Sequence, residues 1–366
     1  MKIGPALKAL LSLRQTYREY HILKGYVPDT IEDLKQKNTL LAEAREKLAH
    51  TQEHLDLLTI RMERTADDLS QRDGQLALVI EDRDQLRARI EELTRFAPPG
   101  HYYSPVPSRE DIEKYIAKLD RTSDDFRAIT LADDKQRELL ESLKTYSSLI
   151  PFKETPVEGL LYYFDNTHYT HTDAAILFCM LHHLRPKRVI EIGSGFSTCV
   201  TLDANRLFLG SQIEITSIDP HPDRIRSLTQ QLPDRLTLVE NNLQETDIRM
   251  FDQLDAGDIL FVDSTHVSKA GSDVNYLFFE ILPRLKRGVV IHLHDIFHRF
   301  EYSARWLREG RAWNEAYLLH AFLQYNDEFR VLLFVNYMQK AHKAWFDEHM
   351  PDAFSKGGGC FWMQKV

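Results

Sequence analysis

The residues best placed to do chemistry begin with a glycine turn after a buried-strand pattern. Arg188–Ile192 has that pattern, and it leads directly into Gly193 and Gly195, after which a helical pattern starts. Glycines at the first strand–helix junction of a doubly wound sheet let the backbone turn sharply and approach a ligand closely. A second strand, 213–218, ends at Asp219, an acid placed to accept hydrogen bonds from both hydroxyls of a ribose. Together the two features predict a site for an adenosine-containing cofactor.

Two kinds of cofactor use this arrangement, a dinucleotide and S-adenosylmethionine. The pyrophosphate of a dinucleotide usually requires the third glycine of GxGxxG, and Thr198 occupies that position here. Near the C-terminus, β-rich runs at 329–336 and 360–365 enclose a loop-like segment and predict an antiparallel pair rather than another crossover. Both observations favour S-adenosylmethionine. The alternative is a structural turn in which Asp219 only caps the next helix.

Acids and histidines also follow the fourth and fifth predicted strands. Asp263 ends the fourth strand, and His266 follows three residues later. His294 and Asp295 end the fifth strand. Because open α/β sheets bind ligands at the carboxyl ends of their strands, we expect these side chains to share one crevice with the glycine turn.

The elements that position these residues belong to an α/β domain predicted over 151–366. Short β-rich runs alternate there with helical patterns, as in βαβ units of a doubly wound, mainly parallel sheet. The expected strands before the antiparallel pair are 188–192, 213–218, 236–240, 258–262 and 288–292, and a helical stretch is expected around 301–325. Residues 98–150 predict a helical connector or cap with two helices, which starts at the hinge Pro98-Pro99 and has Ser108 as a helix cap.

Residues 28–97 predict a coiled coil. An apolar residue recurs every seven positions, and a second, imperfect row follows three positions later. The first row is Leu34, Leu41, Leu48, Leu55, Met62, Leu69 and Leu76, and the second includes Ala44, Leu58, Val79, Leu86 and Leu93. At about 1.5 Å per residue, the helix would be roughly 90–100 Å long, so we expect homo-oligomerisation through helices of other subunits. A single solvated charged helix is the alternative.

The N-terminal segment 1–27 is basic and rich in leucine. Lys2, Lys8, Arg14, Arg18 and Lys24 alternate with apolar residues, which suits an amphipathic segment that docks on an anionic membrane or an assembly. A short helix that starts the coil or packs on a neighbouring subunit is the alternative.

Composition excludes several classes of protein. The 366 residues carry a net charge of −9, which disfavours a protein that holds nucleic acid by its phosphates. The three cysteines, Cys179, Cys199 and Cys360, are too few and too scattered for a disulfide framework, so we expect a reducing, cytoplasmic location.

From about Tyr102 to the end, the sequence resembles the class I S-adenosylmethionine-dependent methyltransferases, in the branch of polysaccharide and natural-product O-methyltransferases. The phrases that carry the resemblance are Tyr103–Pro105, Asp173–Ala174, Val189–Thr198, Ser217–Pro220, Phe261–His266, His292–Phe297 and Trp313–Glu315. The resemblance implies a Rossmann-like seven-stranded sheet that ends with an antiparallel strand. The coiled coil lies outside it.

The resemblance also implies roles for individual residues. The methionine part of S-adenosylmethionine is expected near Glu191, Gly193, Ser194, Gly195 and Ser197. Asp219 is expected to bind the ribose, Asn241 and Asn242 to contact the adenine, and Asp263 to face the crevice where acceptor and methyl group meet.

Methyl transfer to a hydroxyl requires removal of its proton. His266, with an ordinary pKa near neutral, is the predicted general base, and His294 and Asp295 lie beside it. Asp263 and Asp295 could together hold Mg²⁺, although no third acid is evident. The alternative is that Asp295 only orients His266.

The acceptor is predicted to be a sugar, a glycan or another small hydroxylated molecule. Residues expected to contact it are Tyr169, Arg299, Tyr302, Trp313 and Glu315. The competing hypothesis is a non-catalytic coiled-coil scaffold with a degenerate nucleotide-binding domain. The intact glycine turn, Asp219 and Asp263 argue against that decay.

Overall fold

The structure is a computed structural model that describes residues 5–23, 31–94, 96–119, 126–229, 235–350 and 356–366. The chain divides into two compact units, Met1–Arg95 and Phe96–Val366. Each unit is described by itself. Among the helices of these described ranges, none has both the length and the apolar character needed to cross a bilayer.

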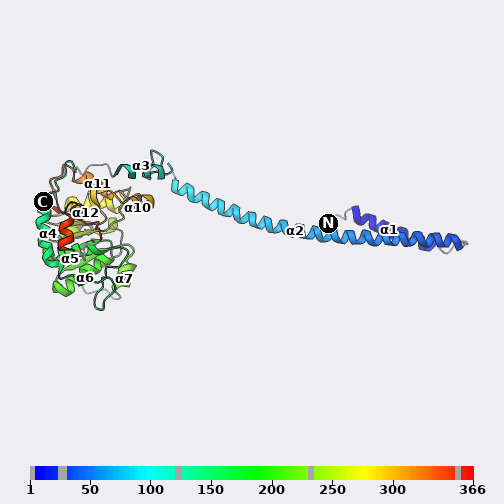
Figure 1. Cartoon of the computed structure of the whole chain (residues 1–366), viewed down its shortest axis with the longest axis horizontal. Helices are drawn as coiled ribbons and strands as arrows, with labels where there is room; N and C mark the ends of the chain where they lie inside the picture. The colour runs from blue at the N-terminus through cyan, green and yellow to red at the C-terminus, as the bar shows by residue number, and fades with distance from the viewer. Residues whose placement is uncertain (1–4, 24–30, 95, 120–125, 230–234, 351–355) are drawn as a thin grey trace. The chain divides into compact units, whose positions relative to one another are not determined.

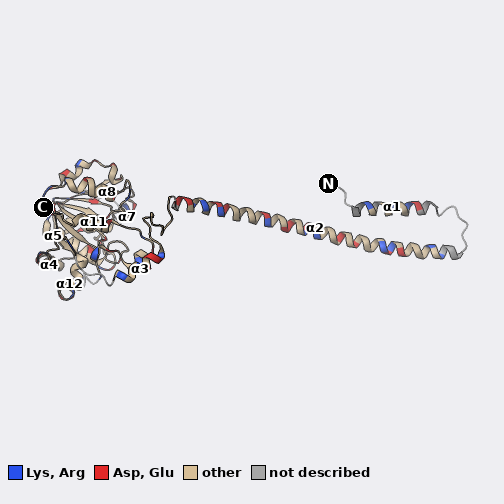
Figure 2. Cartoon of the chain, turned by 90° about the horizontal axis from the view of Figure 1, so that it is seen from above, with Lys and Arg blue, Asp and Glu red and all other residues tan. Residues whose placement is uncertain are grey.

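The N-terminal unit consists of two helices, α1 (Pro5–Leu23) and α2 (Ile31–Thr94) (Figure 1). Helix α2 has 64 residues, or about 95 Å at the usual rise. It contains no proline, and Lys, Arg, Asp and Glu are interspersed along it (Figure 2). The helix predicted within 28–97 is therefore confirmed over 31–94, whereas its pairing into a coiled coil stays a prediction. Lys2, Lys24 and Pro28 lie outside the described residues.

Helix α1 contacts α2 within this unit. The Arg45 guanidinium of α2 donates hydrogen bonds to the Tyr17 hydroxyl of α1, at 2.8 and 3.2 Å. Leu41 and Leu48 of the first heptad row are half-buried in this part of α2. Further along α2, the same row is exposed and includes Met62 (73%), Leu69 (57%) and Leu76 (57%).

The connector contains α3 (Arg109–Leu119) and α4 (Asp133–Ser147), as predicted. Ser108 caps α3, because its hydroxyl accepts from the Asp111 amide at 3.1 Å and donates to the Asp111 carboxylate at 2.7 Å. Gln136 of α4 fastens the connector to the sheet: its amide oxygen accepts from Phe334 N at 2.7 Å.

A seven-stranded sheet forms the centre of the second unit, in the order β3-β2-β1-β4-β5-β7-β6. Strands β1 to β5 are parallel, and β7 pairs antiparallel with both β5 and β6. The strands are β1 (Arg188–Ile192), β2 (Glu214–Ile218), β3 (Leu236–Val239), β4 (Ile259–Val262), β5 (Val290–Leu293), β6 (Phe329–Phe334) and β7 (Phe361–Lys365). The predicted parallel sheet with an antiparallel ending is confirmed.

Helices pack on both faces of the sheet, so the central strands are apolar throughout; all residues of β4 and β5 are buried. The α-helices are α5 (His171–Leu184), α6 (Phe196–Phe208), α7 (Asp223–Thr229), α8 (Asp273–Tyr276), α9 (Leu282–Arg284), α10 (Ala304–Arg308), α11 (Glu315–Leu323), α12 (Val335–Ala341) and α13 (Lys343–His349). Short 3₁₀ or π turns are η1 (Leu243–Glu245), η2 (Ile248–Gln253), η3 (Leu277–Ile281) and η4 (His298–Phe300).

Two regions differ from the prediction. The segment between β6 and β7, expected to be loop-like, contains α12 and α13, since Met338 and Phe346 bury one face of these helices in the core. The helical stretch expected at 301–325 is two helices, because Gly310, with φ of +82°, ends the first and an irregular segment follows.

Candidate active site

A cleft of about 930 Å³ lies beyond the carboxyl ends of β1, β2, β4 and β5. Of the predicted site residues it is lined by Gly193, Ser194, Asp219, Asn242, Asp263, His266, His294, Asp295 and Trp313. Ile218 and Leu243 supply apolar wall beside Asp219. The structure therefore brings these predicted residues together in one cleft.

The glycine turn brings β1 and β4 into close contact. Gly193 has φ of +88°, and a Cβ atom there would lie 2.5 Å from the backbone oxygen of Asp263. The Asp263 amide in turn donates to the Ile192 carbonyl at 2.9 Å. Only glycine satisfies both the backbone conformation and this approach, so Gly193 fixes where Asp263 enters the cleft.

Asp219 is held rigidly at the end of β2. Its Oδ2 accepts from the Ser194 amide at 3.0 Å and from the Ser194 hydroxyl at 2.6 Å, and its Oδ1 accepts from His221 N at 2.8 Å. Each carboxylate oxygen has lone pairs left for further donors. Asp219 is therefore held in one orientation at the cleft and can still accept hydrogen bonds from a ligand.

Glu191 lies beneath the turn rather than in the cleft. Its carboxylate is buried and accepts from the hydroxyls of Ser197 (2.6 Å), Thr198 (2.6 Å) and Ser217 (2.8 Å). Burial raises its pKa to about 7, although the three hydroxyl donors act in the opposite direction. Glu191 and Ser197 thus position the turn from behind and do not line the cleft.

His266 is the centre of a polar cluster in the cleft, beside the glycine turn. Its Nδ1 lies 2.8 Å from Glu315 Oε2, and its Nε2 lies 3.4 Å from Asp263 Oδ1 and 3.6 Å from Asp295 Oδ2. Burial would lower the pKa of His266, but its hydrogen bonds to Asp263 and Glu315 outweigh burial and raise the pKa well above 6.5. These contacts therefore favour the imidazolium form, whereas residue type alone predicts a pKa near neutral.

The same cluster keeps Asp263 ionised. Burial raises its pKa, but the charge of His294 and the hydrogen bond from His266 lower it to a net value of about 2. Its side chain is 40% exposed, compared with 18% for Asp295 and 1% for Glu315. Asp263 and Asp295 thus present carboxylates to the cleft, whereas Glu315 holds the imidazole from behind.

Two residues of this cluster have unusual backbone conformations, and hydrogen bonds hold the backbone at His266 in place. His266 has φ of +60° and Asp295 has φ of +58°, both in the left-handed region. The His266 carbonyl accepts from the amides of Asn314 and Glu315 at 3.0 and 3.1 Å. Those contacts attach the segment before α11 to the loop after β4, and they bring Glu315 to a histidine 49 positions earlier in the chain.

A second buried polar group surrounds Asp173 of α5. Its Oδ1 accepts from the Gly359 amide at 2.8 Å and from the Cys360 thiol at 2.6 Å, and burial raises its pKa. A Cβ atom on Gly358 would lie 2.8 Å from the same oxygen, which accounts for the glycine run before β7. Tyr169 belongs to this group, because its hydroxyl donates to the Asp173 carbonyl at 3.1 Å.

Several predicted residues lie outside the cleft lining. Tyr169 and Tyr302 are buried, and the Tyr302 hydroxyl accepts from Ala316 N at 3.1 Å behind Trp313. Arg299 donates to the Leu119 carbonyl of the connector. The predicted residues absent from the lining are Glu191, Gly195, Ser197, Asn241, Tyr169, Arg299, Tyr302 and Glu315.

Asp263 and Asp295, the two acids expected to hold Mg²⁺, both contact His266 in this structure. Both carboxylates face His266 Nε2, a protonated donor that already supplies positive charge between them. Within the described ranges, no group of three or more His, Cys, Asp or Glu side chains is arranged to hold a metal ion. A hard cation would need oxygen ligands in the position of this imidazolium. The Mg²⁺ prediction therefore stays a prediction.

Sequence reasoning missed the basic and aromatic part of the lining. Arg224, Lys269, Arg305, Trp306 and Arg311 all face the cleft. The available signal was the cluster of Trp and Arg residues between 305 and 313, within the stretch that was expected to be helical. The position of Arg311 depends on the irregular segment between α10 and α11, which sequence patterns do not reveal.

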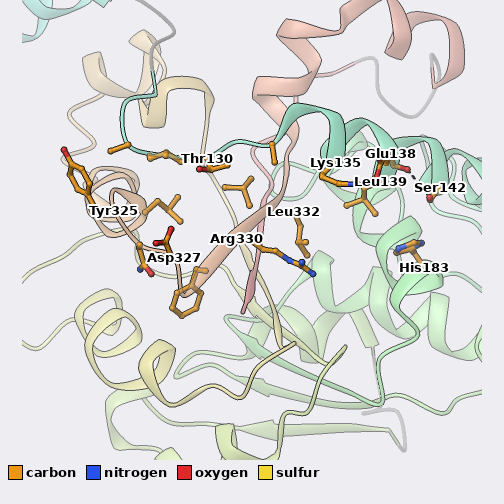
Figure 3. Close-up of a pocket in the computed structure, with 17 residues that line it drawn as sticks. Thr130, Lys135, Glu138, Leu139, Ser142, His183, Tyr325, Asp327, Arg330 and Leu332 are labelled. Carbon is orange, nitrogen blue, oxygen red and sulfur yellow. Dashed lines mark hydrogen bonds and ion pairs between the residues drawn. The ribbon is translucent and has the colours of Figure 1, made fainter.

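Another cavity, of about 550 Å³, lies along the edge strand β6 (Figure 3). Lys135 and Leu139 of α4 face Arg330 and Leu332 of β6 across it. None of the predicted site residues lines this cavity. The chemistry is therefore concentrated in the larger cleft.

Comparisons with known proteins agree with this geometry. The profile of a family described as a methyltransferase domain matches residues 190–296. An uncharacterised protein of Archaeoglobus fulgidus is 32% identical over 168 residues, which are 45% of this chain and 76% of that protein. The family profile, over residues 190–296, spans the turn after β1, the loop after β4 and the end of β5.

Solved structures with similar folds include two methyltransferases. One is Podospora anserina methyltransferase PaMTH1 bound to S-adenosylhomocysteine, at 15% identity, with 71% of this chain and 97% of that chain covered and a TM-score of 0.37. Another is the O-methyltransferase TomG of Streptomyces achromogenes in complex with S-adenosylmethionine, at 12% identity, with 70% and 96% covered and a TM-score of 0.35.

Proposed function

We propose that this chain, whose residues 190–296 match a family described as a methyltransferase domain, is a class I S-adenosylmethionine-dependent methyltransferase and that it methylates a hydroxyl oxygen of a sugar, a glycan or another small hydroxylated acceptor. The observation that carries the proposal is the meeting of Asp263, His266 and Asp295 beside the Gly193 turn, at one end of the cleft. A non-catalytic scaffold would not need carboxylates held this way.

S-adenosylmethionine supplies a methyl group on a sulfonium that is already a good leaving group. Asp219 is oriented to bind its ribose, and Ile218 and Leu243 offer apolar wall for the adenine. Arg224 lies against the glycine turn, where a Cβ on Gly195 would be 3.3 Å from its Cδ. We assign Arg224 to the carboxylate of the methionine part.

In the transfer step, the acceptor oxygen forms a bond to the methyl carbon while the S–C bond breaks and its electron pair stays on sulfur. The acceptor proton passes to a carboxylate oxygen of Asp263 or Asp295, the two acids that face the cleft. His266 is a positioning residue in this scheme, because its imidazolium holds both carboxylates and is itself held by Glu315. The ordinary role of a neutral general base does not suit its raised pKa.

The chain is also proposed to associate with a second copy of itself through α2. Met62, Leu69 and Leu76 repeat every seven residues and are more than half exposed. Such a row is the seam of a left-handed coiled coil when a partner helix covers it. The regular period supports another helix of the same kind as the partner, rather than an irregular surface.

The experiment that tests methyl transfer to oxygen uses S-adenosylmethionine with a deuterated methyl group and the polar metabolite and glycan fraction of cells. Mass spectrometry is expected to find the label in a methyl ether, with release of S-adenosylhomocysteine. Asp263→Asn is expected to abolish the labelling. Label on nitrogen or carbon, or equal labelling by the variant, contradicts the proposal. The same assay with EDTA and then added Mg²⁺ tests the metal prediction.

A further inference from the structure

We propose that the acceptor carries an acidic group, a carboxylate or a phosphate, next to the ring that is methylated. This inference rests on the proposed function and identifies the class of acceptor. It comes from one wall of the cleft, here called the Trp–Arg wall, which consists of Arg305, Trp306, Arg311 and Trp313.

The Trp–Arg wall is continuous with the catalytic cluster. The ring of Trp313 lies 4.5 Å from the ring of His266, and the Arg311 guanidinium lies 4.9 Å from Trp313 and 4.5 Å from Trp306. The two indoles are 5.0 Å apart and nearly perpendicular. An acceptor ring that lies on Trp313 therefore has its reacting hydroxyl near His266 and its far side near Arg311.

The charge of the Trp–Arg wall is positive and incompletely neutralised. Arg305 and Arg311 share one carboxylate, Glu309, at 2.7 and 3.0 Å. The bonds of Arg311 use Nε and Nη2, and within the described part of the chain Nη1 has no hydrogen-bond partner. Lys269, which also lines the cleft, has no ion pair among the described residues.

These cations stand out because the protein as a whole is acidic, with a net charge of −9. An arginine whose guanidinium lies 4.5 and 4.9 Å from two indole rings is held in place before a ligand arrives, so it loses little side-chain entropy when it binds an anion. A planar guanidinium edge matches a carboxylate or a phosphate. Indole faces suit the apolar face of a sugar ring.

The wall is fixed from two sides. Asn314 bonds the loop after β4, and its amide oxygen accepts from Ser268 N at 2.5 Å. On the other side, Arg308 of α10 forms two hydrogen bonds to Glu113 of α3, at 2.8 and 2.9 Å. The connector thus supports the helix that carries Trp306, which gives it a part in acceptor binding.

The test measures binding of matched sugars to the full-length protein saturated with S-adenosylhomocysteine, by calorimetry or saturation-transfer NMR. Methyl glucuronide is compared with methyl glucoside, which differs only in its carboxylate, and glucose 6-phosphate is compared with glucose. We expect the acidic member of at least one pair to bind about tenfold more tightly. The pair that shows the difference distinguishes a carboxylate from a phosphate.

Variants assign the preference to the wall. Arg311→Met combined with Lys269→Met is expected to remove the roughly tenfold preference for the acidic sugar. Arg284→Met is the matched control, because Arg284 is paired with Asp252 outside the cleft. Trp306→Leu is expected to weaken both members of a pair equally.

Equal binding of acidic and neutral sugars overturns the inference, as does a preference that persists in the double variant. Absence of binding by every probe up to about 50 mM also overturns it, since even a weak specific site saturates in this range. Failure of the proposed function gives a different result: the acidic sugar binds preferentially to the protein without S-adenosylhomocysteine, but neither S-adenosylmethionine binding nor methyl transfer is found.

Discussion

The two units differ in the contacts that their side chains make. In the α/β unit, polar groups are buried and paired within the chain: His266 alone contacts Asp263, Asp295 and Glu315. In the N-terminal unit, apolar groups along α2 are exposed, and Met62 is 73% exposed. In one unit these contacts lie within the chain, whereas the other exposes a regular apolar surface along α2, for which we propose a second copy as the partner.

This difference shows how much structure a periodic pattern of apolar residues can predict. Alternation and glycine spacing predict a folded α/β domain because its contacts are internal. A heptad repeat also predicts a helix, but the strand number of the assembly depends on a second molecule. Chemistry and assembly are therefore separable here, and substitutions in one unit are expected to leave the other intact.

The largest effect on activity is expected for Asp263→Asn. The substitution keeps the shape of the side chain but removes the charge that faces the cleft and replaces one carboxylate oxygen with an amide donor. We expect kcat to fall by a factor of about 10³, measured as release of S-adenosylhomocysteine. Asp247→Asn, at an exposed acid outside the cleft, is the control. A fall of less than tenfold would remove Asp263 from the proton-transfer step.

Gly193→Ala tests the close contact between β1 and β4. The added Cβ meets the Asp263 carbonyl at 2.5 Å and sits at a positive φ. Gly257 has the same φ of +88° with nothing within 4 Å, so Gly257→Ala isolates the cost of backbone conformation. In urea denaturation we expect a loss of about 3 kcal/mol at Gly193 and about 1 kcal/mol at Gly257. Equal losses would show that the approach of Asp263 is not constrained.

Glu191→Gln tests the buried acid beneath the turn. A carboxyl with a folded-state pKa of about 7 and an unfolded pKa of 4.5 takes up protons on folding between these values. The contribution of Glu191 to the free energy of unfolding is thus most favourable at low pH. This contribution falls by up to about 3 kcal/mol as pH rises from 4.5 to 7. The variant is expected to flatten this part of the pH dependence of unfolding. An unchanged slope would mean that the pKa of Glu191 is near its usual value.

Leu69→Glu is expected to have the smallest effect on catalysis and a clear effect on the mass of the assembly in solution. A charge in the predicted seam opposes pairing of α2 with a second copy, so sedimentation is expected to show dissociation while kcat stays unchanged. Ser70→Glu, one position along the same exposed helix, is the control. A monomeric wild-type protein, or a Leu69→Glu variant that keeps its mass, contradicts the proposed pairing.

The sequence predicted the sheet well because each strand carries its own apolar run between turn residues. The first strand, Arg188–Ile192, matches its predicted bounds, and β2 to β5 differ by only one or two residues at either end. Asp219 and Asp263 were predictable for the same reason, since each follows its strand directly.

The rest depends on contacts between distant parts of the chain. Glu315 binds His266 from 49 positions away, and that carboxylate contributes to raising the pKa of the imidazole. Arg311 reaches the cleft from the irregular segment that begins where Gly310 ends α10. Local patterns carry neither fact, so the histidine was predicted as a neutral base and, of the Trp–Arg wall, only Trp313 was predicted.

The central claim, that the cleft binds S-adenosylmethionine through the ends of β1 and β2, is tested most directly by calorimetric titration of the cofactor. We expect a dissociation constant of about 1–10 μM for the wild type and for Asp223→Ala, an exposed acid at the start of α7. Asp219→Ala is expected to bind at least about tenfold more weakly. Absence of binding by the wild type, or undiminished binding by Asp219→Ala, would contradict the claim.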